Sequence, residues 1–132
     1  MNVHEQGFCD FLVEPGRTRM RTLLQLGAKR RKDVRVLLDH AIVLNKRYSE
    51  HLIGALHLAG SIEQRLRTLG APPTCHVISA SPELDDQELQ LKTALQSAIG
   101  RGHGTYLSCL PGRLGYFEYE GPKSGFLLRR AD

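Results

Sequence analysis

The stretch Pro72–Ala80, PPTCHVISA, marks the point at which this sequence changes from helical to strand character. Its two prolines end the preceding helical pattern, because proline lacks an amide hydrogen and clashes with the preceding turn. The segment that follows is short, has the β-branched Val77 and Ile78 in its middle, and is bounded by turn formers. This pattern is typical of a strand. We therefore predict the first strand over residues 75–80.

Downstream of this strand, the sequence predicts one helix and three more strands. Asp85 stands as an N-cap with Glu88 three residues later, a capping box that predicts a helix from Asp85 to Ile99. Turn formers then separate three strand-like segments, at Thr105–Leu110, Leu114–Glu120 and Phe126–Arg130. These segments predict an antiparallel meander. If the first two strands of this half are parallel, their helical crossover should be right-handed.

Upstream of the prolines, three helices are predicted. The first covers Thr18–Leu26, and the second carries an apolar stripe from Val34 to Ile42 at helical spacing and ends near Asn45. A third is expected from about Ser49 to Leu69, with a kink or break at Gly60. The fold class expected is α+β: an N-terminal helical segment followed by a β-α-β-β-β unit with a small mixed or antiparallel sheet.

Size and composition are those of one globular domain. The chain has 132 residues, 41% of them hydrophobic, which suits a single domain over residues 1–132. No apolar run is long enough to span a membrane, and the N-terminus lacks the pattern of a secretion signal. Three cysteines without close pairing favour reduced thiols over a disulfide framework. We expect a cytoplasmic protein that does not bind membranes.

Positive charge is concentrated in the first half. Residues 1–70 carry 12 Lys and Arg against 7 Asp and Glu, whereas residues 71–132 carry 6 against 7. The run Lys29–Lys32 falls in the predicted first turn of the second helix, where the helix dipole disfavours cations. A bound phosphate would offset that repulsion, because helix amides and basic side chains can hold it together.

The leading hypothesis is therefore a non-enzymatic binding or regulatory protein that contacts an anionic partner, either the backbone of DNA or RNA or an acidic protein. Solvated surface charge is the simpler interpretation of the same pattern. The spacing around Gly27 does not favour a helix-turn-helix, and the aromatic strand Gly115–Tyr119 is assigned to packing rather than base stacking. The residues predicted to contact nucleic acid are Arg17, Arg19, Arg21, Lys29, Arg30, Arg31, Lys32 and Arg35.

Two alternatives remain open. In the first, the chain is a protein-interaction module or a homo-oligomer that uses Val36 and Val43, which lie off the main apolar stripe. In the second, it is a small enzyme with Cys109 as nucleophile and His76 or His103 as base, although no family signature supports catalysis. No cysteine and histidine spacing matches a structural zinc site, so neither a metal nor a cofactor is predicted.

Overall fold

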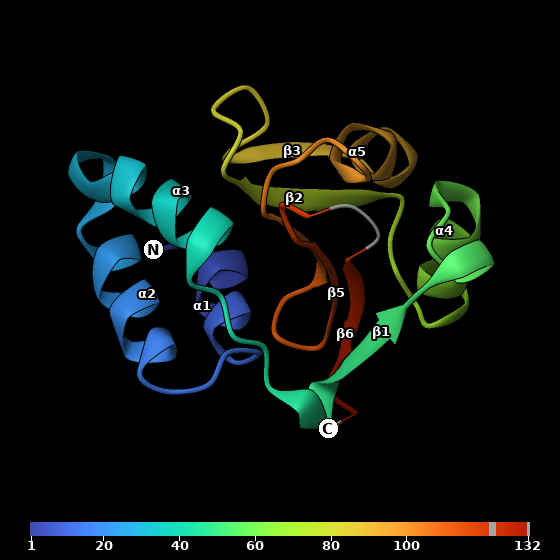
Figure 1. Cartoon of the computed structure of the whole chain (residues 1–132), viewed down its shortest axis with the longest axis horizontal. Helices are drawn as coiled ribbons and strands as arrows, with labels where there is room; N and C mark the ends of the chain where they lie inside the picture. The colour runs from blue at the N-terminus through green and yellow to red at the C-terminus, as the bar shows by residue number, and fades with distance from the viewer. Residues whose placement is uncertain (122–123, 132) are drawn as a thin grey trace.

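A computed structural model describes residues 1–121 and 124–131. It contains an open six-stranded antiparallel sheet in the order β1-β6-β5-β4-β2-β3 (Figure 1). The strands are β1 (Ser49–Leu52), β2 (Thr74–Ser79), β3 (Gln87–Gln90), β4 (Thr105–Leu110), β5 (Leu114–Glu118) and β6 (Gly125–Arg129). The α+β class is confirmed. The predicted order of elements is not, because the helices interleave with the strands.

Helices cover both faces of the sheet, giving three layers (Figure 1). One face packs against α1 (Val3–Cys9), α2 (Gly16–Gln25) and α3 (Arg31–His40), with the 3-10 turn η1 (Gly27–Arg30) joining α2 to α3. The other face packs against α4 (Ala59–Thr68) and α5 (Leu91–Ala98). The remaining 3-10 turns are η2 (Lys46–Tyr48) and η3 (Gly54–Leu56).

The central strands are buried on both faces, because both faces carry helices. Successive residues of β5 alternate between the two hydrophobic cores. Phe117 therefore lies in the core formed with α1, α2 and α3, whereas Tyr116 lies in the core formed with α4 and α5. Both rings are fully buried. The prediction that this aromatic strand serves packing is confirmed, and both of its sides are buried.

The N-terminal helix α1 was not predicted from the sequence. Asn2 caps it through a reciprocal capping box, in which the Glu5 amide donates to Asn2 Oδ1 at 2.8 Å and the Asn2 amide donates to Glu5 Oε1 at 2.9 Å. An asparagine followed three residues later by glutamate is a recognised N-terminal signal. The helix was therefore accessible to sequence reasoning.

The helix predicted to start near Ser49 is wrong over about its first half. Residues 49–52 form the edge strand β1, which pairs with β6 so that Ser49 lies opposite Leu128. Gly54 then adopts a φ of +59°, which an α-helix cannot accommodate, and α4 begins only at Ala59. Strand pairing with a distant segment outweighs the local helical period of these residues.

The helix predicted to start at Asp85 is also wrong at its beginning. Asp85 does not cap a helix: its Oδ1 accepts a hydrogen bond from the Ser79 amide at 3.0 Å, and Asp86 turns the chain with a φ of +61°. Residues 87–90 then form β3, and α5 starts at Leu91. Strands β2 and β4, which flank this segment in the chain, are antiparallel rather than parallel neighbours.

Candidate functional site

Arg31, one of the predicted nucleic-acid contacts, lies in a largely buried ion-pair network. Its Nε and Nη2 atoms donate to the two carboxylate oxygens of Asp85 at 2.6 and 2.8 Å, and its Nη1 atom donates to Glu5. The side chains of Glu5 and Asp85 are 8% and 5% exposed. Hydrogen bonding to Asp85 raises the pKa of Arg31 further above its usual value. This guanidinium joins α1, α3 and the segment after β2.

Three more of the predicted cations face carboxylates. Arg35 Nη1 lies 3.8 Å from the same Asp85, and Arg30 Nη1 lies 3.2 Å from Asp33. Arg17 Nε lies 4.0 Å from Glu14, at the limit of an ion pair. Arg31 and Arg35 are thus partly buried and face the buried carboxylate of Asp85, whereas the Arg30 and Arg17 contacts are solvent-exposed and of little energetic weight.

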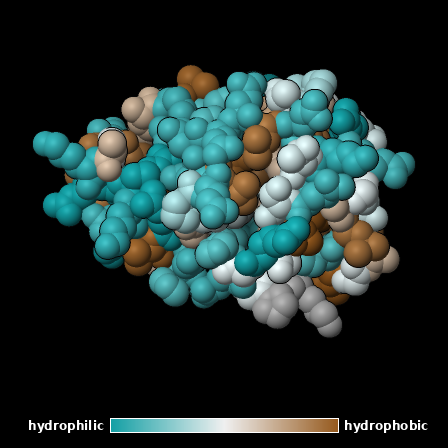
Figure 2. Space-filling view, turned by 90° about the horizontal axis from the view of Figure 1, so that it is seen from above, coloured by the Kyte–Doolittle hydropathy of each residue, from teal (hydrophilic) through white to brown (hydrophobic). Residues whose placement is uncertain are grey.

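Within residues 1–121 and 124–131, no carboxylate lies within ion-pair distance of the other four cations: Arg19, Arg21, Lys29 and Lys32. Lys29, Arg30 and Lys32 are exposed and lie where η1 meets the start of α3; we call these three residues the basic corner. Figure 1 shows this corner at the outer end of the α2 and α3 pair. Hydrophilic side chains predominate at that end of the molecule in Figure 2.

The residues of the cysteine hypothesis do not come together. Cys109 is 3% exposed and faces the core beneath α4 and α5, where burial raises its pKa to about 12. His76 lies opposite Ser108 in the neighbouring strand, and His103 is exposed in the loop before β4. A thiol that stays protonated at neutral pH is a poor nucleophile. The geometry gives no support to catalysis by Cys109.

His76 instead belongs to a small polar group that the sequence did not predict. Its ring stacks on His4 with the centroids 5.0 Å apart, and His4 Nδ1 forms a 2.8 Å hydrogen bond with the hydroxyl of Ser108. Burial, followed by the neighbouring His76, lowers the pKa of His4. The group fastens α1 to strands β2 and β4.

A second unpredicted group lies in the core. The Glu118 carboxylate is fully buried and contacts His57 Nε2 at 2.8 Å, the Gly100 amide at 3.0 Å and the hydroxyl of Tyr116. Burial, then the bond to Glu118, raises the pKa of Tyr116. Tyr116 lies two residues before Glu118 in β5, whereas His57 and Gly100 come from distant segments whose proximity no local pattern could have predicted. The group connects the segment after η3 to the centre of the sheet.

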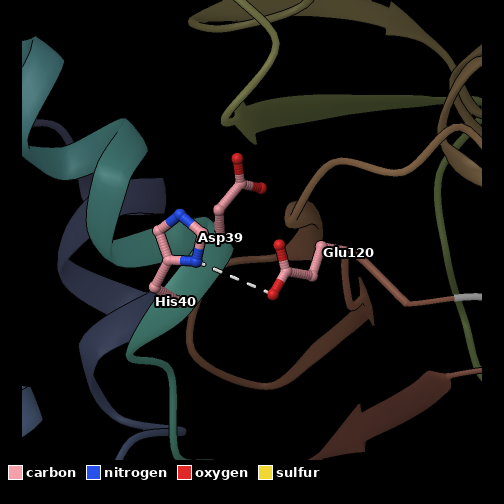
Figure 3. Close-up of side chains that lie close together, drawn as sticks. All are labelled: Asp39, His40 and Glu120. Atoms are coloured by element: carbon pink, nitrogen blue, oxygen red, sulfur yellow. Dashed lines mark ion pairs between the residues drawn. The ribbon is translucent and has the colours of Figure 1, made fainter.

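A third group is exposed to solvent and contains Asp39 and His40 of α3 and Glu120, which follows β5 (Figure 3). One ligand atom from each of these side chains lies within 4.8 Å of the others. The sequence separates Glu120 from the helix by about 80 positions, which is why pattern analysis could not assemble the group. His103, predicted as an alternative base for Cys109, lies beside Asp39 instead.

Among residues 1–121 and 124–131, no helix is long and apolar enough to cross a bilayer. Comparison with known proteins adds no assignment, since no family model matches the chain and neither a curated protein nor a solved structure matches it significantly.

Proposed function

We propose that this chain is a non-enzymatic binding protein that holds the phosphate backbone of a nucleic acid at its basic corner. The observation that carries this proposal is that Lys29 and Lys32 are exposed cations without a carboxylate partner among the described residues. Arg31, between them, is anchored to Asp85 and Glu5. The ion pairs of Arg31 therefore hold in place the backbone that carries Lys29 and Lys32.

The local electrostatics favour an anion at this corner. The N-terminus of a helix carries about half a positive charge, so each exposed cation there costs roughly 0.3 to 1 kcal/mol at low salt. No side chain caps α3, whose N-cap residue is Arg30 itself. A phosphate group would relieve the repulsion and would accept hydrogen bonds from Lys29, Arg30 and Lys32. On α2, Arg19 and Arg21 are two further cations without a carboxylate partner among the described residues, and they are the next candidates for phosphate contacts.

Fewer residues are proposed to contact nucleic acid than the sequence predicted. Arg31 and Arg35 are withdrawn from the contact surface, because their guanidinium groups face Asp85. They position the corner without touching the partner. The contacts proposed are those of the basic corner, followed by Arg19, Arg21 and Arg17 along α2.

The test is fluorescence anisotropy of labelled single-stranded and duplex DNA and RNA at two salt concentrations. The wild type is compared with the triple variant Lys29→Ser, Arg30→Ser, Lys32→Ser, and with a charge-matched control, Lys92→Ser, Arg101→Ser, Arg113→Ser. Each lost phosphate contact reduces the slope of log K against log salt by about 0.9 on duplex DNA. We expect the corner variant to bind weakly with a slope smaller by up to about 3, and the control to bind like the wild type. Equal binding by both variants would exclude the corner as the contact surface.

A second candidate function is protein recognition, favoured by an apolar groove beside α3. The groove has a volume of about 350 Å³ and is lined by residues before α2, in α2, in α3 and in the segment that follows α3, among them Pro15, Met20 and Val43. Val43 and Val36 are 60% and 53% exposed. Concentration-dependent mass in light scattering, abolished by Val43→Ser, would support self-association through this groove. Constant monomer mass would exclude it.

A further inference from the structure

We infer that Asp39, His40 and Glu120, with His103 as a fourth ligand, form a binding site for a divalent transition-metal ion. Two imidazoles and two carboxylates are the donor types that first-row divalent ions such as Zn²⁺ and Co²⁺ accept, whereas Mg²⁺ and Ca²⁺ prefer oxygen ligands throughout. The site lies apart from the basic corner, at the opposite end of α3, and does not depend on nucleic-acid binding.

The three-residue core of the site is already assembled. His40 Nδ1 lies 3.7 Å from Glu120 Oε1, and Figure 3 shows both side chains beside Asp39 at the end of α3. His103 Nδ1 lies 4.0 Å from Asp39 Oδ2. Ligand atoms on one tetrahedral ion lie about 3.4 Å apart when the metal bonds are near 2.1 Å. Small rotations of Asp39, His40 and Glu120 would therefore bring their ligand atoms onto one ion, and His103 would reach it from its position beside Asp39.

The fold fixes the segments that carry the ligands. The Gly104 amide donates to Asp39 Oδ1 at 2.8 Å, which orients the carboxylate and leaves its second oxygen directed toward His103. Gly104 itself packs on the last turn of α3 so closely that a Cβ there would meet Leu38 O at 2.0 Å. This contact holds the His103 loop against Asp39. Backbone bonds to ligand residues are typical of supported metal sites.

The third segment, which carries Glu120, is held in a similar way. The hydroxyl of Tyr119 donates to the carbonyl oxygen of Ile42 at 3.0 Å, which ties the end of β5 to the chain just beyond α3. Glu120 is the next residue and is brought beside His40 by this bond. The C-terminal end of α3 also carries partial negative charge, which favours a cation at this place. Two carboxylates and the helix end together match the charge of a divalent ion.

The test is isothermal titration of the full chain with Co²⁺ and Zn²⁺, with Mg²⁺ as the comparison ion. We expect one Co²⁺ or Zn²⁺ per chain and at least tenfold weaker binding by His40→Ala, Glu120→Gln. His103→Ala should weaken binding less, because three ligands remain. The control His51→Ala, Glu83→Gln removes one exposed imidazole and one exposed carboxylate elsewhere and should bind like the wild type.

Two further measurements make the test decisive. The visible spectrum of the Co²⁺ complex should change in His40→Ala, Glu120→Gln but not in the control, and circular dichroism should show that all variants are folded. Unchanged metal affinity in His40→Ala, Glu120→Gln, equal losses in the control, or Mg²⁺ binding as tight as Co²⁺ binding would each overturn the inference. Nucleic-acid binding by the same variants should be unchanged, which separates this site from the proposed function.

Discussion

The guanidinium of Arg31 is nearly surrounded by protein groups, and removing it should be costly. Substitution Arg31→Met leaves the carboxylates of Asp85 and Glu5 without their cation in a site almost closed to water. Loss of one partner from a buried ion pair costs about 3 to 5 kcal/mol. Urea denaturation should show the free energy of unfolding falling by about 3 kcal/mol. A loss below about 1 kcal/mol would mean that the network contributes little.

The control for this prediction is the neighbouring arginine. Arg30 forms its ion pair with Asp33 in solvent, where both side chains are about half exposed. Exposed pairs contribute less than about 1 kcal/mol. Arg30→Met should therefore leave stability nearly unchanged, although it should weaken the binding of nucleic acid. Comparison of the two variants therefore distinguishes Arg31, which stabilises the fold, from Arg30, which is proposed to contact the nucleic acid.

Stability should fall at alkaline pH because of the buried thiols. Burial raises the pKa of Cys75 and Cys109 from 9.0 to about 12, and that of Cys9 to about 11. At a pH between 9.0 and the raised pKa of a thiol, the unfolded chain has lost a proton that the folded chain retains. Each rise in pH in this range therefore favours unfolding. The slope should reach about 1.4 kcal/mol per pH unit for each thiol.

The measurement is denaturant unfolding at a series of pH values from 7 to 11. Stability should be flat below about pH 8 and should decline above pH 9, and the decline should be shallower in Cys75→Ala than in the wild type. The same raised pKa predicts slow alkylation of all three thiols at neutral pH. A stability profile that is level up to pH 11 would contradict the buried placement of the thiols.

At the scale of elements, the contact between the His103 loop and α3 depends on a glycine without a side chain. Gly104→Ala would place a Cβ 2.0 Å from Leu38 O, so the loop or the helix must move. Overpacking of this kind costs about 1 to 3 kcal/mol. Gly60→Ala is the matched control, because Gly60 lies in α4 with nothing within 4 Å of the new Cβ. Thermal unfolding should show a lower Tm for Gly104→Ala and an equal or higher Tm for Gly60→Ala.

Elements whose packing follows their own periodicity were predictable from the sequence. The stripe of α3 places Val34, Leu37 and Leu38 in the core, as the helical spacing requires. The three C-terminal strands lie close to their predicted limits because turn formers separate them. Residues 49–52 and 87–90 were misassigned, since each forms an edge strand whose structure comes from pairing with a neighbour. The local sequence does not indicate which distant strand such an edge strand will pair with.

The candidate sites were less predictable than the elements. Cationic character at Lys29 and Lys32 was visible in the sequence, and these residues remain candidate contacts. The structural role of Arg31 could not be predicted, because its partner Asp85 is 54 positions away in the sequence. Asp85 had also been interpreted from its local pattern as a helix cap. The Asp39, His40 and Glu120 group depends on three-dimensional proximity alone. Spacing rules find sites only when the ligands share an element.

At the scale of the whole molecule, protection from solvent should increase from the edges of the sheet to its centre. Strands β4 and β5 are buried on both faces and paired on both sides, whereas β1 and β3 are short edge strands. Amides that open only on global unfolding lie in such central strands. Hydrogen exchange should therefore be slowest in β4 and β5 and fastest in β3. Faster exchange in β5 than in β1 would contradict this sheet order.

The strand order also has a consequence for synthesis on the ribosome. Helices α1 to α3 leave the exit tunnel first, yet the apolar residues they bury pack against Tyr106, Phe117 and Leu128, which are translated much later. Edge strand β1 must likewise wait for β6. Contacts this distant in the chain make folding slow and expose apolar surface meanwhile. The sheet can therefore close only after β6 has been translated, and the apolar residues of α1 to α3 lack their packing partners until then.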